Sequence, residues 1–135
     1  MSGYEVKRID AMEASYWGSF HKARAELGIT SFGMQVLDLP PASDGYPEHD
    51  HGSDGQEEVY VVLAGGGEIE IDGRRHAIDP QIMAGVQPGI RRKVFPGPQG
   101  MRLLVIGGIP GKPYEIVDAT ELGAPDPTAG QPPPG

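Results

Sequence analysis

The chain has 135 residues, among them 21 glycines and 14 prolines, and carries a formal net charge of −8 at pH 7. Its length indicates one domain that can bury a core without disulfides, and the absence of cysteine excludes a disulfide framework, a cysteine-ligated zinc site and a thiol nucleophile. The acidic balance argues against nucleic acid or an anionic membrane as a partner. The N-terminus has no apolar signal core, and no apolar run approaches the roughly 20 residues that a membrane helix needs, so we expect a cytoplasmic protein.

The first part of the chain predicts a helix over residues 10–27. Asp10 and Glu13 have the spacing of a capping box, and Gly28 supplies a stop signal at the other end. The apolar residues between them fall on one helical face. We expect this helix to pack outside the main fold.

From Ser31 the pattern changes to short apolar runs separated by glycine and proline, which is typical of an all-β sandwich, jelly roll or barrel. The predicted strands are Ser31–Leu39, Glu57–Leu63, Glu68–Ile71, Arg74–Ile78, Ile82–Gln87, Arg92–Phe95 and Met101–Gly107. Asp72-Gly73 predicts a tight hairpin turn. The stretch 124–135 has no large apolar residue and predicts disorder. The chain therefore divides into a helical extension (1–30), a barrel domain (31–117) and a disordered tail (118–135).

Two histidines two positions apart, His49 and His51, are the first candidates for chemistry. On a strand, residues two apart point to the same face, so both imidazoles can reach one metal ion. Glu58 opens the next apolar strand and offers a carboxylate ligand. Two histidines and one carboxylate suit Fe, Mn, Ni or Zn. The same acidic stretch can also be read as a solvated loop that binds no ion.

The segment Gly45–Gly73 resembles the first motif of the cupin superfamily, which runs His-x-His, a short loop, Glu, six residues, Gly. Glu58 and Gly65 have that last spacing, so the resemblance selects Glu58 over Glu57 as the inward carboxylate. It covers about residues 31–108 and implies a double-stranded β-helix, that is, a jelly-roll barrel of the small single-domain kind. It also implies a homodimer.

The second cupin motif, Pro-x-Gly-x-x-His, departs from the pattern in this chain. Here Pro88 and Gly89 are present, but Arg92 stands where the histidine ligand is expected, and arginine does not bind metals. One possibility is a metal held by His49, His51 and Glu58, with Arg92 clamping an anionic ligand. A second is that Arg92 replaces the metal and pairs with Glu58. A third is a structural salt bridge without a function.

These readings lead to two hypotheses of function. The first is a metal-dependent enzyme of the oxygenase, isomerase or lyase type that acts on a small anionic molecule. The second is a metal-free, non-catalytic barrel that binds a small molecule. In both, the predicted ligand contacts are Arg92, Tyr60, which shares the face of Glu58, and Gln35, unless its neighbour Met34 is the one that faces inward. His76 is expected on the surface.

Overall fold

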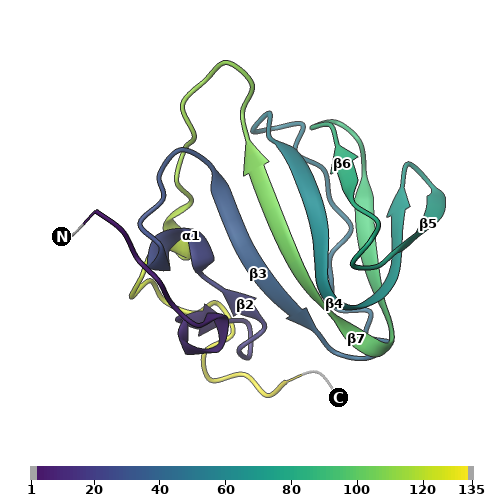
Figure 1. Cartoon of the computed structure of the whole chain (residues 1–135), viewed down its shortest axis with the longest axis horizontal. Coiled ribbons are helices and arrows are strands. Elements are labelled where there is room, and N and C mark those ends of the chain that lie inside the picture. Colours follow the sequence, from purple (N-terminus) through teal and green to yellow (C-terminus); the bar gives the residue numbers. More distant parts are fainter. Residues whose placement is uncertain (1–2, 134–135) are drawn as a thin grey trace.

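A computed structural model of the chain describes residues 3–133 and shows a curved, antiparallel β-sheet with very little helix (Figure 1). The strands follow the order β1-β2-β3-β7-β4-β5, and β6 pairs with β4. The larger strands are β3 (Gly33–Leu39), β4 (Glu57–Ile71), β5 (Arg74–Ile78), β6 (Ala84–Val86) and β7 (Arg92–Gly108). This confirms the predicted all-β class.

Strands β4 and β7 form one long ribbon that bends in the middle. They pair from Glu57 opposite Gly108 to Ile71 opposite Arg92, with register shifts on both sides of Gly65. A Cβ atom at Gly67 would lie 2.1 Å from the carbonyl oxygen of Phe95, so only glycine permits this close approach of two backbones. The bend brings both ends of the ribbon to the same end of the barrel, at the top of Figure 1, which we call the upper end.

The bend also explains one wrong prediction. Four separate strands were predicted where the structure has only β4 and β7. The glycines and prolines at the predicted breaks form bulges in which the chain changes direction without leaving the ladder. The hairpin prediction is confirmed: Asp72 and Gly73 have φ values of 51° and 81°, as a two-residue type I′ turn requires.

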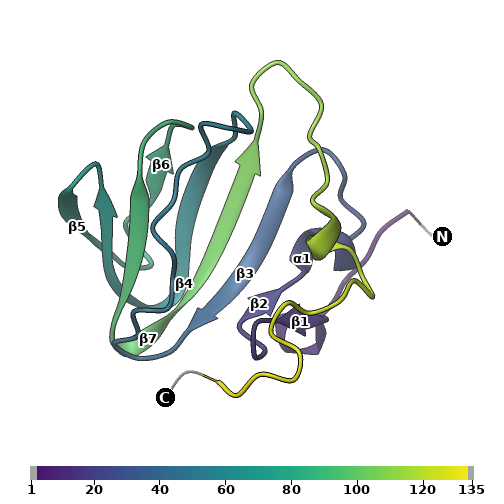
Figure 2. The same cartoon turned by 180° about the vertical axis from the view of Figure 1, so that it is seen from behind.

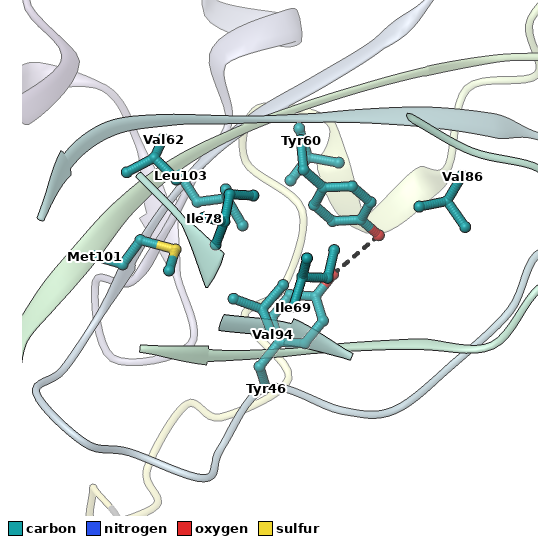
Figure 3. Close-up of a cluster of buried hydrophobic side chains, with 10 residues drawn as sticks. Tyr46, Tyr60, Val62, Ile69, Ile78, Val86, Val94, Met101 and Leu103 are labelled. Atoms are coloured by element: carbon teal, nitrogen blue, oxygen red, sulfur yellow. Dashed lines mark hydrogen bonds between the residues drawn. The ribbon is translucent and has the colours of Figure 1, made fainter. Parts of the chain in front are cut away.

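The inner face of the curved sheet is filled by apolar side chains (Figure 3). The buried cluster consists of Tyr46, Tyr60, Val62, Ile69, Ile78, Val86, Val94, Met101, Leu103 and Val105. Within it the hydroxyls of Tyr46 and Tyr60 lie 3.4 Å apart. A second, smaller cluster on the outer face joins Val36 of β3 to Met12 and Ala23 of the N-terminal segment. That segment therefore covers one outer face of the barrel.

The predicted helix over residues 10–27 is wrong. The segment forms a 3-10 turn (Ile9–Ala11), two short strands, β1 (Ala14–Ser15) and β2 (Phe20–His21), and one helical turn, α1 (Ala23–Glu26). Positive φ angles of 54°, 58° and 80° at residues 16, 17 and 18 make a turn that no α-helix contains. Strand β2 pairs with the edge of β3, so its backbone donors and acceptors are satisfied by the sheet.

The stretch predicted to be a disordered tail is described over residues 118–133. It begins with a 3-10 turn (Asp118–Thr120) and runs beside the N-terminal segment in both views (Figures 1 and 2). The amide of Tyr16 donates to Asp126 (3.2 Å), and the indole of Trp17 donates to the carbonyl of Gln131 (3.1 Å). Hydrogen bonds rather than apolar burial hold this stretch, which is why its composition did not reveal it. The last two residues, 134 and 135, lie outside the described part.

Across residues 3–133, no helix has the length and hydrophobicity needed to cross a bilayer.

Candidate functional site

The two motif histidines lie at the upper end of the barrel, beside the start of β7. The backbone of His49 makes a two-way bridge with Arg92, with N–O distances of 3.0 and 2.9 Å. Two residues further on, the amide of His51 donates to the carbonyl of Pro88 (2.7 Å). Both side chains thus leave the same face, as predicted, and their ring centroids lie 5.0 Å apart.

One oxygen of Glu58 is the centre of the site. Its Oε1 atom lies 3.1 Å from Nε2 of His51 and 3.7 Å from Nε2 of His49. The same oxygen accepts hydrogen bonds from the hydroxyl of Tyr60 (2.7 Å) and from a terminal nitrogen of Arg92 (3.2 Å). Burial alone would raise the pKa of Glu58, but its interactions with His49, His51 and Tyr60 outweigh burial and hold that pKa far below the usual range. Glu58 is therefore ionised at neutral pH.

The other nitrogen of each imidazole faces a hydrogen-bond acceptor. Nδ1 of His49 lies 3.1 Å from the carbonyl oxygen of Pro47, and Nδ1 of His51 lies 3.0 Å from a carboxylate oxygen of Asp54. The carbonyl beside Nδ1 of His49 favours a proton on that nitrogen, whereas both nitrogens of His51 face carboxylates and can each carry a proton. Both Nε2 atoms are therefore directed at one oxygen of Glu58, and a metal ion would bind them in place of any proton they carry.

These three ligand atoms fit a single metal ion. They all lie within 4.8 Å of one another. Nε2 of His51 is buried and makes no hydrogen bond of good geometry to any described residue. The carboxylate of Glu58 raises the pKa of His51, burial opposes this, and Asp54 adds to the rise. Without a metal, a proton therefore competes for the same nitrogen.

Arg92 points into the barrel and is fully enclosed. Its side chain has no exposed surface, one terminal nitrogen contacts Glu58, and the other donates to the carbonyl of Gln87 (2.8 Å). This geometry resembles the second predicted possibility, in which Arg92 pairs with Glu58. It differs from an open clamp, because both terminal nitrogens already have partners.

The other predicted ligand contacts have different environments. Tyr60 is completely buried, and its hydroxyl is used by Glu58. Gln35 lies two residues before the core-facing Leu37 on the same strand, so its side chain points into the barrel. Met34 points the other way and packs on the outer cluster. With its amide turned so that the nitrogen faces carbonyls, Gln35 donates to the backbone of His21 (2.9 Å). Gln35 thus lies on the predicted face without contacting His49, His51 or Glu58, the three residues that we call the metal group.

Two cavities lie elsewhere in the fold. One, of about 260 Å³, lies between β5 and β6 and is lined mainly by apolar side chains, with Ile69, Met83 and the exposed His76 on its walls. The other, of about 370 Å³, lies at the bend of the ribbon beside Pro41 and Arg102. The metal group belongs to neither. It reaches solvent directly, since the side chains of His49 and His51 are 29% and 19% exposed.

A second group of acidic and imidazole side chains, Asp10, His21 and Asp38, lies on the outer side of the barrel. Arg102 lies among them and pairs with Asp10 and with both oxygens of Asp38 (2.8 and 3.1 Å). The guanidinium therefore takes the place that a cation would need. This group ties the N-terminal segment to β3 and β7.

Three polar residues beside the metal group were missed by the sequence reading. Asp54 orients His51, and Gln56 donates to Asp54 (3.3 Å). Tyr114, from the loop after β7, reaches back to Gly33 at the start of β3. Asp54 could have been found from the sequence, because a carboxylate three residues after His51 is close enough to contact its imidazole. Nothing in the sequence marks Tyr114, because its role depends on where the loop returns.

No protein-family model matches this sequence, and no curated protein matches it either. Solved structures do. A cupin protein from Bacteroides fragilis superposes with a TM-score of 0.66 at 19% identity, covering 87% of this chain and 93% of that one. The cupin domain of an XRE-family transcriptional regulator from Enterobacter cloacae gives 0.51 at 18% identity, over 60% of this chain and 84% of that domain.

A protein from Acidithiobacillus ferrooxidans, assigned provisionally as a sugar phosphate isomerase, gives a TM-score of 0.55 at 21% identity, over 65% of this chain and 56% of that one. At such identities the likeness concerns the fold. It agrees with the fold that the Gly45–Gly73 motif predicted. The chain therefore has the cupin fold, as a single small barrel.

Proposed function

We propose that this chain binds one divalent transition metal through His49, His51 and Glu58 and binds a small molecule beside it at the upper end of the barrel. The observation that carries the proposal is the direction of the two imidazoles. Nδ1 of each ring faces an acceptor, so that both Nε2 atoms are directed at one oxygen of Glu58, and the three atoms lie within 4.8 Å of one another. Like-signed electron pairs repel unless a cation or a proton lies between them.

The ligand set suits Fe, Mn, Ni or Zn, and three protein ligands leave coordination positions open. A bound ion would act as a Lewis acid toward an oxygen of the small molecule. The chain's own residues would hold this ion in place. Asp54 fixes the ring of His51, and hydrogen bonds from Tyr60 and Arg92 orient the carboxylate of Glu58.

A second candidate is a metal-free barrel that binds a small molecule without catalysis. The observation in its favour is the contact of Arg92 with Glu58 (3.2 Å), which supplies a positive charge where a metal would. The names of the similar structures include both a regulator domain and a provisionally assigned isomerase, so they support neither candidate over the other. The expected homodimer and cytoplasmic location stay predictions.

Elemental analysis of the full chain, purified without chelator and without a metal-affinity column, separates the two candidates. We expect about one transition metal per chain in the wild type and almost none in His49→Ala. His76→Ala is the matched control, since it removes an exposed histidine distant from the group, and its metal content should equal that of the wild type. Well under one ion per chain, with no uptake from added zinc or manganese, would exclude the metal-dependent function.

A further inference from the structure

Two glycines lie in one row with Glu58 across the inner face of the sheet. Gly33 of β3 pairs with Gly107 of β7, and Gly107 pairs with Glu58 of β4. Directly paired residues of an antiparallel sheet point to the same face. That face is the inner one. Leu37 lies four residues after Gly33 and Leu103 four residues before Gly107, so each leucine shares the face of its glycine, and both leucines pack in the core. The inner face beside Glu58 thus has two positions without a side chain.

Polar atoms from two loops occupy these positions. A Cβ atom on Gly33 would lie 2.8 Å from the hydroxyl oxygen of Tyr114. A Cβ atom on Gly107 would lie 2.7 Å from Oε1 of Gln56 and 3.3 Å from Cγ of Glu58. A phenol and a carboxamide therefore lie on the inner face, in line with the metal group.

Gln56 is linked to the candidate metal site by a hydrogen bond, and Tyr114 lies at the other end of the glycine row, against Gly33. Gln56 is buried, and its amide nitrogen donates to Asp54 (3.3 Å), the residue that orients His51. The carbonyl oxygen of this amide is the atom that faces the glycine row. Burial raises the pKa of Tyr114; Arg24 lowers it, and the charges of Asp54 and Glu58 raise it further, as expected of a phenol near both carboxylates.

Distance and charge indicate what such a row would recognise. Neighbouring strands lie about 4.8 Å apart, so Gly33 and Glu58 are about 10 Å apart, which a molecule of five or six carbons can span. The guanidinium of Arg92 has both terminal nitrogens paired. Its Nε has no partner among the described residues, but the side chain has no exposed surface and so cannot reach an anion at the open end of the site. The loop that leads into β4 carries Asp50 and Asp54, whose negative charges repel anions.

We propose that the ligand of this site is an uncharged, hydroxyl-bearing molecule of about five or six carbons, whose hydroxyls hydrogen-bond to Oε1 of Gln56 and to Tyr114 while its other end meets the metal group. This rests on the proposed function and replaces the anionic ligand expected from the sequence. That expectation required an open Arg92.

The test uses the full chain loaded with zinc and two probes of equal size, ribose and ribonate, titrated by saturation-transfer NMR. We expect ribose to bind and ribonate to bind more weakly. Tyr114→Phe removes the hydroxyl, and Gly33→Ala displaces it with a methyl group. Each should weaken ribose binding about three- to tenfold, the effect of one neutral hydrogen bond. Gly108→Ala is the matched control, because its added Cβ meets no atom within 4 Å.

Zinc content is measured for every variant, and ribose is also titrated into metal-free protein. A chain that is purified without metal and takes up neither zinc nor manganese refutes the proposed function, and the effect of Tyr114→Phe on ribose binding then still tests the row of polar groups. Tighter binding of ribonate than of ribose, no binding of ribose in either state, or equal ribose affinity of Tyr114→Phe and wild type would each overturn the proposal.

Discussion

Replacing Arg92 by methionine tests how the charge of Glu58 is balanced. The substitution keeps an unbranched side chain of similar length and removes the contact with Glu58 (3.2 Å) and the hydrogen bond to Gln87 (2.8 Å). Removing one partner of a buried ion pair costs about 3–5 kcal/mol. We expect the lower end, about 3 kcal/mol, because Tyr60 and His51 still contact the carboxylate.

The corresponding change in melting temperature follows from the size of the chain. With an unfolding entropy of about 2.1 cal/mol/K per residue, 135 residues give a shift of about 3.5 °C per kcal/mol, so metal-free Arg92→Met should melt about 10 °C below the wild type. Zinc at 100 times its dissociation constant contributes about 2.7 kcal/mol and should restore most of this loss. The affinity of Arg92→Met for zinc should also exceed that of the wild type, because a neighbouring positive charge has been removed.

Differential scanning calorimetry with and without zinc measures both effects. Arg75→Met is the matched control: this arginine is 47% exposed and pairs with Glu68 and Glu70 on the surface, so its loss should cost at most about 1 kcal/mol. The reasoning is refuted if metal-free Arg92→Met melts within 2 °C of the control, or if zinc raises its melting temperature no more than that of the wild type.

Two further predictions concern the scaffold. Arg102 lowers the pKa of Asp38, whose ordinary value is 3.8. Ionised Asp38 therefore stabilises the fold above that pH, and this contribution is lost as the pH falls through the lowered pKa. Urea unfolding between pH 2 and 6 should accordingly show a shallower acid dependence of stability in Asp38→Asn. Gly67→Ala should lose several kcal/mol of unfolding free energy or fail to fold, because its Cβ would lie 2.1 Å from the backbone of Phe95. The control is Gly85→Ala, whose Cβ meets no atom within 4 Å, and its stability should stay within about 1 kcal/mol of the wild type in the same unfolding assay. A normally stable Gly67→Ala would show that the ribbon does not need this close approach.

The barrel could be predicted from the sequence because its signals are local. The hairpin at Asp72-Gly73 and the alternation of β4 depend only on neighbouring residues, and both are found in the structure. The resemblance to the cupin motif selected Glu58 over Glu57 by its spacing from Gly65, and in the structure Glu58 lies on the inward face of β4 with Tyr60.

The errors have a common cause in contacts between distant segments. Residues 10–27 have helical periodicity, but β2 finds its partner in β3, and an available sheet edge overrides a weak helical preference. The stretch beyond residue 118, for which disorder stays a prediction, makes hydrogen bonds to the N-terminal segment that composition does not register. Tyr114 reaches the site only because the loop after β7 returns to Gly33.

The bent ribbon also has a consequence for the order of folding. At one end of the pairing between β4 and β7, Arg92 lies opposite Ile71, next to the Asp72-Gly73 turn. At the other end, Glu58 lies opposite Gly107. Pairs close in sequence form first because the loops they close are short, so the contact between Arg92 and Glu58 waits until the ribbon has zipped and bent. An interaction that is absent from the transition state acts on the unfolding rate. Glu58, which would bind the metal, thus also takes part in a contact that forms late, and an ion bound to it would lengthen the lifetime of the folded barrel without hastening its formation.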